Sequence, residues 1–217
     1  MPYSTAHKAN TRRRIIEAAR AVFNRRGMAS ATIDDVMQEA NLTRGGFYNH
    51  FSSKEDLLLE VISSYPECVP SDRWPDVRLD GDASASSYAS QMIDAYLSTS
   101  HLYDLDVQCP LVALASDVRQ SDERINKAYE ELLREMAHRF ERGLMDNSRT
   151  RAGPEAHRKA TALMALLVGG LSVARTMENK VLSEEIIGAC REMAQQIFGH
   201  PDNDRVQPSS SSRKVHS

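Results

Sequence analysis

The sequence contains few of the residues on which turns, strands and covalent cross-links depend. Its 217 residues include only 10 glycines, 8 prolines and 3 cysteines, and aromatic residues make up 6% of the chain. The scarcity of turn-forming residues and of β-branched runs favours helices over strands. Three scattered cysteines are too few for a disulfide framework or a zinc site. We therefore expect a reducing, cytoplasmic setting with no metal and no cofactor.

No apolar stretch is long enough to cross a membrane, so we expect no membrane partner. The longest such stretch, ALMALLVGGLSVA, is shorter than the about 20 residues that a transmembrane helix needs. The sequence also lacks the spacing of a Ser-His-Asp triad, a His-Glu-x-x-His zinc motif and a phosphate-binding nucleotide loop. We expect a protein that is not an enzyme, and an enzyme that uses a helical cavity is the less favoured alternative.

Apolar residues recur at helical spacing along most of the chain, and this pattern predicts an all-α fold. Longer helices are expected at residues 11–26, 33–40, 85–101, 110–118, 122–146, 154–179 and 184–198. Gly27 is expected to end the first of these helices, and Ser183 is expected to cap the last. A short helix is expected after Thr43, and another from a Ser52–Glu55 capping box to Pro66.

Residues 66–84 have the composition of a loop and mark a change of subdomain. We therefore divide the chain into a three-helix head, residues 1–53, and a helical body, residues 54–200. The tail, residues 201–217, has almost no apolar side chains and is expected to be disordered.

The net charge of -3 conceals an asymmetry between head and body. Residues 1–53 contain eight Lys and Arg against four Asp and Glu, so the head carries +4 and the remainder carries -7. A basic unit on an acidic body favours a polyanion as partner of the head. A solvated helix face would give the same excess, so the charge alone leaves both interpretations open.

The head has the layout of a DNA-binding helix-turn-helix, in which a short second helix lies in the major groove. Arg44 has the donors to bind guanine O6 and N7, and Asn49 can pair with adenine. The other candidates suit phosphates or close backbone approach. The candidate DNA-binding residues are Thr32, Thr43, Arg44, Gly45, Gly46, Tyr48, Asn49, His50 and Lys54.

Two consecutive glycines, Gly45 and Gly46, are unexpected in a short helix because glycine costs a helix interior about 1 kcal/mol relative to alanine. Without side chains there, the backbone can approach DNA closely. A glycine pair also marks an ordinary turn, and the dipeptide by itself does not separate the two interpretations.

Residues 11–57 resemble the DNA-binding domain of the TetR family of bacterial repressors. The resemblance rests on Thr-Ile-Asp-Asp-Val, on Ala-x-Leu-Thr and on Gly-x-Phe-Tyr-x-His-Phe-x-x-Lys-Glu-x-Leu. It implies an all-α homodimer whose body binds a small-molecule effector, and whose two heads leave a palindromic operator in double-stranded DNA when the effector binds. An activator can carry the same head. By position, the resemblance implies phosphate contacts from Thr32, Thr43, Tyr48, His50 and Lys54, and base contacts from Arg44 and Gly45.

The resemblance leaves the body to be interpreted from its own residues. The last two long helices have broad apolar faces that suit a four-helix dimer interface, although an ordinary core helix has the same pattern. The candidate dimer residues are Leu163, Leu167, Leu171, Ile186, Cys190, Met193 and Ile197. Methionine and aromatic side chains of the middle helices are candidates for an effector pocket or for the core. They are Met92, Tyr96, Tyr103, Tyr129, Met136 and Met164.

Cys109 is a further candidate for the effector site. Pro110 suits the first position of a helix and places Cys109 at the N-cap, where the helix dipole lowers a thiol pKa. The segment resembles one TetR subgroup, which includes the N-ethylmaleimide-responsive repressor and in which this cysteine senses electrophiles. Gln108 replaces the glycine of that subgroup. A buried, inert cysteine is the alternative.

Overall fold

The computed structural model describes residues 5–67, 77–146 and 153–199, and within these ranges every regular element is a helix. The predicted all-α fold is confirmed. In chain order the elements are α1 (Thr5–Ser30), α2 (Ile33–Glu39), η1 (Arg44–Asn49), α3 (Lys54–Ser63), η2 (Tyr65–Glu67), α4 (Ala85–Tyr96), α5 (Thr99–Tyr103), α6 (Pro110–Ala113), α7 (Ala115–Arg119), α8 (Glu123–Asp146), α9 (Pro154–Arg175) and α10 (Lys180–Phe198). The predicted disordered tail lies outside the described residues.

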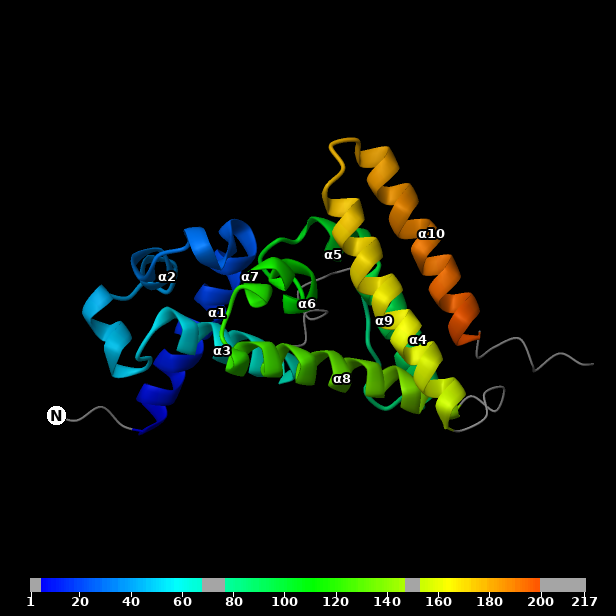
Figure 1. The fold of residues 1–217 in the computed structure, drawn as a ribbon, viewed down its shortest axis with the longest axis horizontal. Coiled ribbons are helices and arrows are strands. Elements are labelled where there is room, and N and C mark those ends of the chain that lie inside the picture. Colours follow the sequence, from blue (N-terminus) through cyan, green and yellow to red (C-terminus); the bar gives the residue numbers. More distant parts are fainter. Residues whose placement is uncertain (1–4, 68–76, 147–152, 200–217) are drawn as a thin grey trace, which may run out of the picture.

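The head and the body lie at opposite ends of the molecule (Figure 1). At the head end, α1 packs against α2 and against α3, the first helix of the body, around Phe23, Phe47 and Leu57, which are all fully buried. In the body, α8 runs from the head towards α9, and the antiparallel pair of α9 and α10 forms the far edge (Figure 1). Each long helix buries one apolar stripe, as its sequence spacing predicts.

The third helix, α3, contacts both α1 of the head and α8 of the body. Its cap differs from the expected one, because Ser53 rather than Ser52 accepts a hydrogen bond from a backbone amide, that of Asp56, at 3.1 Å. The expected boundary between residues 53 and 54 stays a prediction, and it places α3 at the joint between head and body.

Several helix ends differ from the sequence prediction. Gly27, with φ 73° and ψ 156°, interrupts α1 as expected, but the helix continues to Ser30. The single helix expected at residues 85–101 is divided at Leu97, and Ser98 caps the following helix α5. Leu114 divides the next segment in the same way, between α6 and α7.

The end of α9 and the start of α10 also differ from the prediction. The helix α9 ends at Arg175, and Asn179 caps α10 by accepting from the amides of Val181 and Leu182. Ser183, the expected cap, lies inside α10 and donates to the carbonyl of Ala174 at 2.7 Å. A serine one turn inside a helix often bonds to a backbone carbonyl, so sequence alone does not distinguish it from a cap.

Candidate nucleic-acid interface and effector groove

The segment predicted to enter DNA is a short 3-10 helix, η1, held in place by aromatic packing. Phe47 is fully buried, and its ring lies 5.7 Å from that of Phe51 between ring centroids. The guanidinium of Arg12 stacks over the ring of Phe51, with its carbon 4.4 Å from the ring centroid. Packing rather than helix propensity therefore fixes η1 on α1 and α2.

The two glycines of η1 have different surroundings. Neither has a positive φ, so the backbone there does not require glycine. A Cβ atom at Gly45 would meet nothing within 4 Å, whereas one at Gly46 would lie 3.6 Å from Met37 Cε. Only Gly45 faces away from the protein. Gly46 faces α2 instead, and the prediction that both glycines leave room for DNA stays a prediction.

Outward side chains surround Gly45. Tyr48 is 59% exposed and meets the edge of Phe47, and Asn49 and Thr43 are also exposed. The Thr43 hydroxyl makes no capping hydrogen bond. The Arg44 guanidinium forms an ion pair with Asp34 of α2. Both partners are well exposed, so exchanging the carboxylate for a DNA group costs little.

Two predicted phosphate contacts are engaged within the head. The Lys54 ammonium donates to the carbonyls of Met28 at 2.7 Å and Ala31 at 2.9 Å, and so ties the start of α3 to the end of α1. Thr32 forms a capping box with Asp35, and these hydrogen bonds lower the pKa of the Asp35 carboxyl. These hydrogen bonds within the protein do not follow from the motif, and the phosphate contacts of Lys54 and Thr32 stay a prediction.

His50 borders a groove that the sequence did not reveal. The groove separates the start of α1 from η1 and has a volume of about 550 Å³. It is lined by His7, Lys8, Thr11, Met37, Leu42, Thr43, Gly46, Asn49 and His50. Burial and the charges of Lys8 and Arg12 lower the pKa of His50. The start of α1 thus adds basic groups beside the predicted DNA surface.

Two sets of contacts connect the head to the body. The Asp117 carboxylate on α7 accepts from the backbone amides of Met28 at 3.1 Å and Ala29 at 3.3 Å, next to the break at Gly27. On α1, Asn24 donates to the carbonyls of Asp106 and Gln108 at 3.3 and 3.2 Å. We call the bonds from Asp117 to Met28 and Ala29 the α7 latch.

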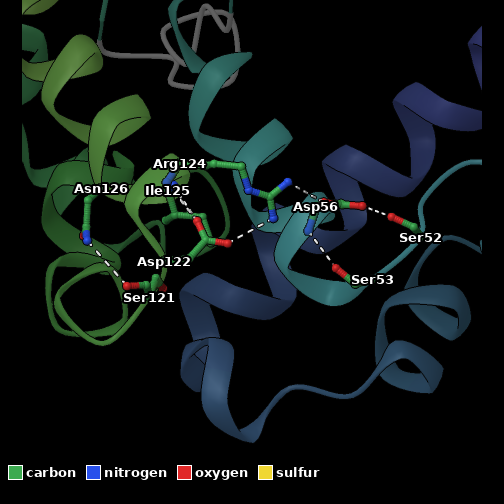
Figure 2. Close-up of polar contacts among 8 residues, drawn as sticks. All are labelled: Ser52, Ser53, Asp56, Ser121, Asp122, Arg124, Ile125 and Asn126. Atoms are coloured by element: carbon green, nitrogen blue, oxygen red, sulfur yellow. Dashed lines mark hydrogen bonds and ion pairs between the residues drawn. The ribbon is translucent and has the colours of Figure 1, made fainter.

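A second contact joins α3 to the start of α8, as Figure 2 shows. Arg124 contacts Asp56 at 3.3 Å and Asp122 at 3.0 Å. The backbone amide of Asp56 in turn donates to the hydroxyl of Ser53, the cap of α3. The arginine is exposed, so this contact orients α3 more than it stabilises the fold.

An open, mainly apolar groove lies between α8 and α9, with α6 at one end. Its volume is about 760 Å³, within the range of small-molecule sites. Its apolar lining includes Leu111, Leu133, Met164 and Val168, and its polar lining includes Arg134, His138, Glu141 and His157. Tyr129 also lines it and donates to the Leu111 carbonyl at 2.7 Å.

The structure brings together only some of the predicted effector residues. Tyr129 and Met164 line the groove. Met136 is buried in the core and Met92 is packed against it. Tyr103 is not among the residues that line the groove; it is 45% exposed and donates to Glu184 at 3.1 Å. The remaining candidates, Tyr96 and Cys109, lie in a buried polar cluster.

Cys109 is at the predicted N-cap of α6, but its thiol does not have the expected acidity. The side chain is fully buried, and burial raises its pKa. The helix has only four residues, so its dipole is small. The prediction of a lowered pKa is wrong, and the buried alternative is the observed one.

The predicted dimer residues also divide into two groups. Leu163, Leu167 and Leu171 are fully buried inside the protomer, so they have no surface to offer a partner. A Cβ on Gly170 would lie 2.6 Å from the Cys190 sulfur, so Cys190 faces α9 of its own chain. The other candidates are at least partly exposed: Ile186, Met193 and Ile197.

Small and apolar residues that are exposed or partly exposed instead form a stripe on each of the last two helices, with spacings of four, three and four residues. The stripes consist of Ala162, Leu166, Gly169 and Val173 on α9 and of Leu182, Ile186, Ala189 and Met193 on α10. Val173 is 50% exposed and Met193 49%. Such spacing places each set on one helix face.

Within the described ranges, no three His, Cys, Asp or Glu side chains gather into a possible metal site. The same residues include no helix that could cross a membrane.

Two family models match the chain. Residues 15–61 match the model described as bacterial regulatory proteins of the tetR family. Residues 86–184 match the C-terminal domain described as transcriptional regulator LmrA/YxaF-like. The head and most of the described body are thus similar to known regulators.

Relatives and solved structures agree with these matches. The chain is 36% identical over 92 residues, 42% of its length, to two Pseudomonas putida proteins. The match spans 42% of the HTH-type transcriptional regulator SrpR and 67% of the uncharacterized HTH-type transcriptional regulator TtgW. The fold is similar to that of reduced E. coli NemR, with 19% identity, a TM-score of 0.67 and coverage of 89% of this chain and 99% of that one. A TetR regulator from Legionella pneumophila, at 23% identity, has a TM-score of 0.68, with 90% and 98% covered.

Proposed function

The chain belongs to the TetR family of transcriptional regulators, and on this basis we propose that it is a repressor that leaves a palindromic operator when a small molecule binds. It acts as a homodimer in the cytoplasm, with one head on each half of the operator. The observation that carries the proposal is the outward face of η1. There, Arg44 and Tyr48 flank a glycine with open space before it.

In this proposal the head reads DNA through a few side chains. Arg44 exchanges Asp34 for a guanine, and Gly45 allows the backbone to approach the groove wall. Tyr48, Thr43 and His50 bind phosphates, and Lys8 extends this contact along the backbone. Lys54 and Thr32 support the reading surface from within the head.

The homodimer forms through the exposed stripes of α9 and α10. Pairing these two helices with their symmetry mates buries side chains such as Val173 and Met193 in a four-helix bundle. Because α9 and α10 lie at the end opposite the head (Figure 1), an interface on these helices leaves both heads available to one DNA duplex.

The α8–α9 groove receives the effector, and the α7 latch couples it to the head. Leu111 of α6 lines the groove, and α7 follows α6 after a single residue, Leu114. A displacement of α6 therefore reaches Asp117 and, through it, the amides of Met28 and Ala29. The latch thus joins effector binding to the orientation of the head.

A bound small molecule is favoured over covalent attack by an electrophile. Electrophiles react with thiolates, and the fully buried Cys109 has a raised pKa that keeps it a thiol. Alkylating the folded protein and measuring its operator affinity separates the two: we expect Cys109 to stay unmodified and the affinity to be unchanged.

Selection of bound duplexes from a random DNA pool tests the proposed function. We expect the wild-type protein to enrich a palindrome. Arg44→Ala should lose preference at particular base pairs, whereas Lys8→Ala should weaken binding to all sequences alike. A pool without any enriched sequence contradicts the proposal, and an enriched site at which bound protein raises transcription would make the protein an activator.

A further inference from the structure

A buried polar cluster lies beside the effector groove, where five elements meet. Tyr65 of η2, Tyr96 of α4 and Cys109 at the start of α6 are all less than 10% exposed. His101 of α5 lies edge-on to Tyr96, with ring centroids 4.9 Å apart, and Arg175 ends α9. So many polar groups in an interior position call for a full set of hydrogen bonds.

Arg175 Nη1 and the Tyr96 hydroxyl lack such bonds within the described part of the chain. Arg175 donates through Nε to the Leu102 carbonyl at 3.1 Å and through Nη2 to the His101 carbonyl. Its third nitrogen, Nη1, is buried and has no partner. The Tyr96 hydroxyl, 7% exposed as a residue, lies beside Cys109 without a well-formed hydrogen bond to it.

Capping the end of α5 explains only part of this arrangement. It accounts for two of the nitrogens of Arg175, but not for Nη1 or for the Tyr96 hydroxyl. Burial lowers the pKa of Arg175 to about 10, so the neighbouring groups do not fully compensate for the loss of water around this cation. A buried cation in this condition is stabilised by an anion.

The cluster continues the effector groove along α9. Val168 lines the groove, and Arg175 is seven residues further on, so the two share a helix face about 10 Å apart. The first turn of α6 separates the two regions, with Leu111 in the groove and Cys109 in the cluster. Tyr129 borders both, because it lines the groove and its pKa is raised by burial and by the nearby Cys109 side chain.

We propose that Arg175 and Tyr96 form the polar end of the effector site and that the effector is an amphipathic organic acid. Its carboxylate or other anionic group binds Arg175 Nη1 and the Tyr96 hydroxyl, and its apolar body occupies the α8–α9 groove. Entry of the acid displaces the first turn of α6, which the cap residue Cys109 does not secure with a side-chain hydrogen bond. This inference rests on the proposed function, because it names the chemical class of the effector.

Two fluorescent probes with similar apolar bodies test the inference. The probe 1-anilinonaphthalene-8-sulfonate carries an anionic group, and N-phenyl-1-naphthylamine carries none. We expect the full-length protein to bind the sulfonate at least about tenfold more tightly, the effect of one charge-assisted contact. Equal affinity for the two probes would overturn the proposal.

Variants assign the preference to Arg175. Arg175→Gln should remove about tenfold of the affinity for the sulfonate and leave that for the neutral probe within twofold, whereas Arg175→Lys should retain most of the preference. The matched control Arg142→Gln, at an exposed arginine of α8 outside the groove lining, should change neither affinity. Equal weakening of both probes by Arg175→Gln, or a loss of preference in the control, would contradict the assignment.

A second variant covers the case in which Arg175→Gln does not fold. Tyr96→Phe removes only the hydroxyl and should weaken binding of the sulfonate about threefold or more without affecting the neutral probe; no difference between the probes would overturn the proposal. Operator binding is measured on the same samples without probe, so that failure of the anion site can be distinguished from failure of the proposed regulator function. A protein that binds no DNA but prefers the sulfonate would refute the regulator, not the anion site.

Discussion

Gly45 is at the outer surface of η1, and its surroundings explain why a helix contains it. Its φ is not positive, so the backbone would accept any residue, and the space in front of it is open in the free protein. The position therefore costs helix stability without any benefit to the isolated fold. In our account the benefit appears only when DNA occupies that space.

Gly45→Ala should separate folding from DNA binding. We expect the melting temperature to stay the same or rise, because alanine favours the helix by up to about 1 kcal/mol. Operator affinity should fall about tenfold, because the methyl group meets the DNA at a close contact. The matched control is Gly81→Ala, at another glycine with open space in front of it, which should alter neither quantity. Unchanged operator affinity in Gly45→Ala would contradict the assigned role.

The buried imidazole of His101 should make the free energy of unfolding depend on pH. Burial and the charge of Arg175 lower its folded pKa from 6.5 to about 3. Because the folded pKa of His101 is lower than the unfolded one, the unfolded chain binds a proton first as pH falls. The contribution of neutral His101 to the free energy of unfolding is therefore complete well above pH 6.5 and is lost as pH falls towards 3. Between pH 8 and pH 5 this group should remove about 2 kcal/mol from the free energy of unfolding.

Denaturant unfolding of wild type and His101→Gln at both pH values measures this contribution. The variant should lose less stability on acidification by about 2 kcal/mol, and the exposed control His157→Gln should behave like the wild type. An identical loss in wild type and His101→Gln would show that His101 is not the responsible group.

The sequence predicted the role of a single residue correctly where that role depends on whether the side chain is buried or exposed. Helical periodicity predicted that Phe47 is buried and Tyr48 exposed, because buried positions recur every three to four residues on a helix. The partners of Lys54 were not predictable, since its ammonium reaches carbonyls 23 and 26 residues away. The acidity of Cys109 was likewise missed, because burial by distant elements outweighs the local cap position.

At the scale of elements, the proposed function depends most on the helix breaks at Leu97 and Leu114. They divide two expected helices and so produce the short elements α5, α6 and α7. Neither break is at a glycine or proline, so the apolar pattern runs through both and predicts one helix in each case. These short elements contain His101, Leu111 at one end of the α8–α9 groove, and Asp117 of the α7 latch.

The α7 latch should set how firmly the head is oriented. Asp117→Ala removes two hydrogen bonds to backbone amides and should weaken operator affinity about threefold to tenfold. Asp117→Asn keeps the accepting oxygen and should stay close to wild type. Amide hydrogen exchange at Met28 and Ala29 should speed up only in the alanine variant. Protected amides in Asp117→Ala would show that the latch does not hold this segment.

At the scale of the whole molecule, our proposal assigns the stripes of α9 and α10 to the interface of a homodimer. Met193→Glu should convert a dimer into a monomer, since two-fold symmetry brings the new charge into the interface twice. The control Leu105→Glu changes an equally exposed apolar residue, 47% exposed, outside the stripes. Sedimentation equilibrium distinguishes the two, and a dimer in both variants would place the interface elsewhere.

The central claim is that a homodimer of this chain reads a two-fold operator through η1. The most direct measurement is the mass of the complex with a selected operator duplex, obtained by analytical ultracentrifugation for wild type and Met193→Glu. The account predicts two wild-type chains per duplex, with half-sites spaced by about one helical turn (about 34 Å) or a multiple of it, and much weaker binding of the monomeric variant. A single chain per duplex, or equal affinity of the monomeric variant, would contradict it.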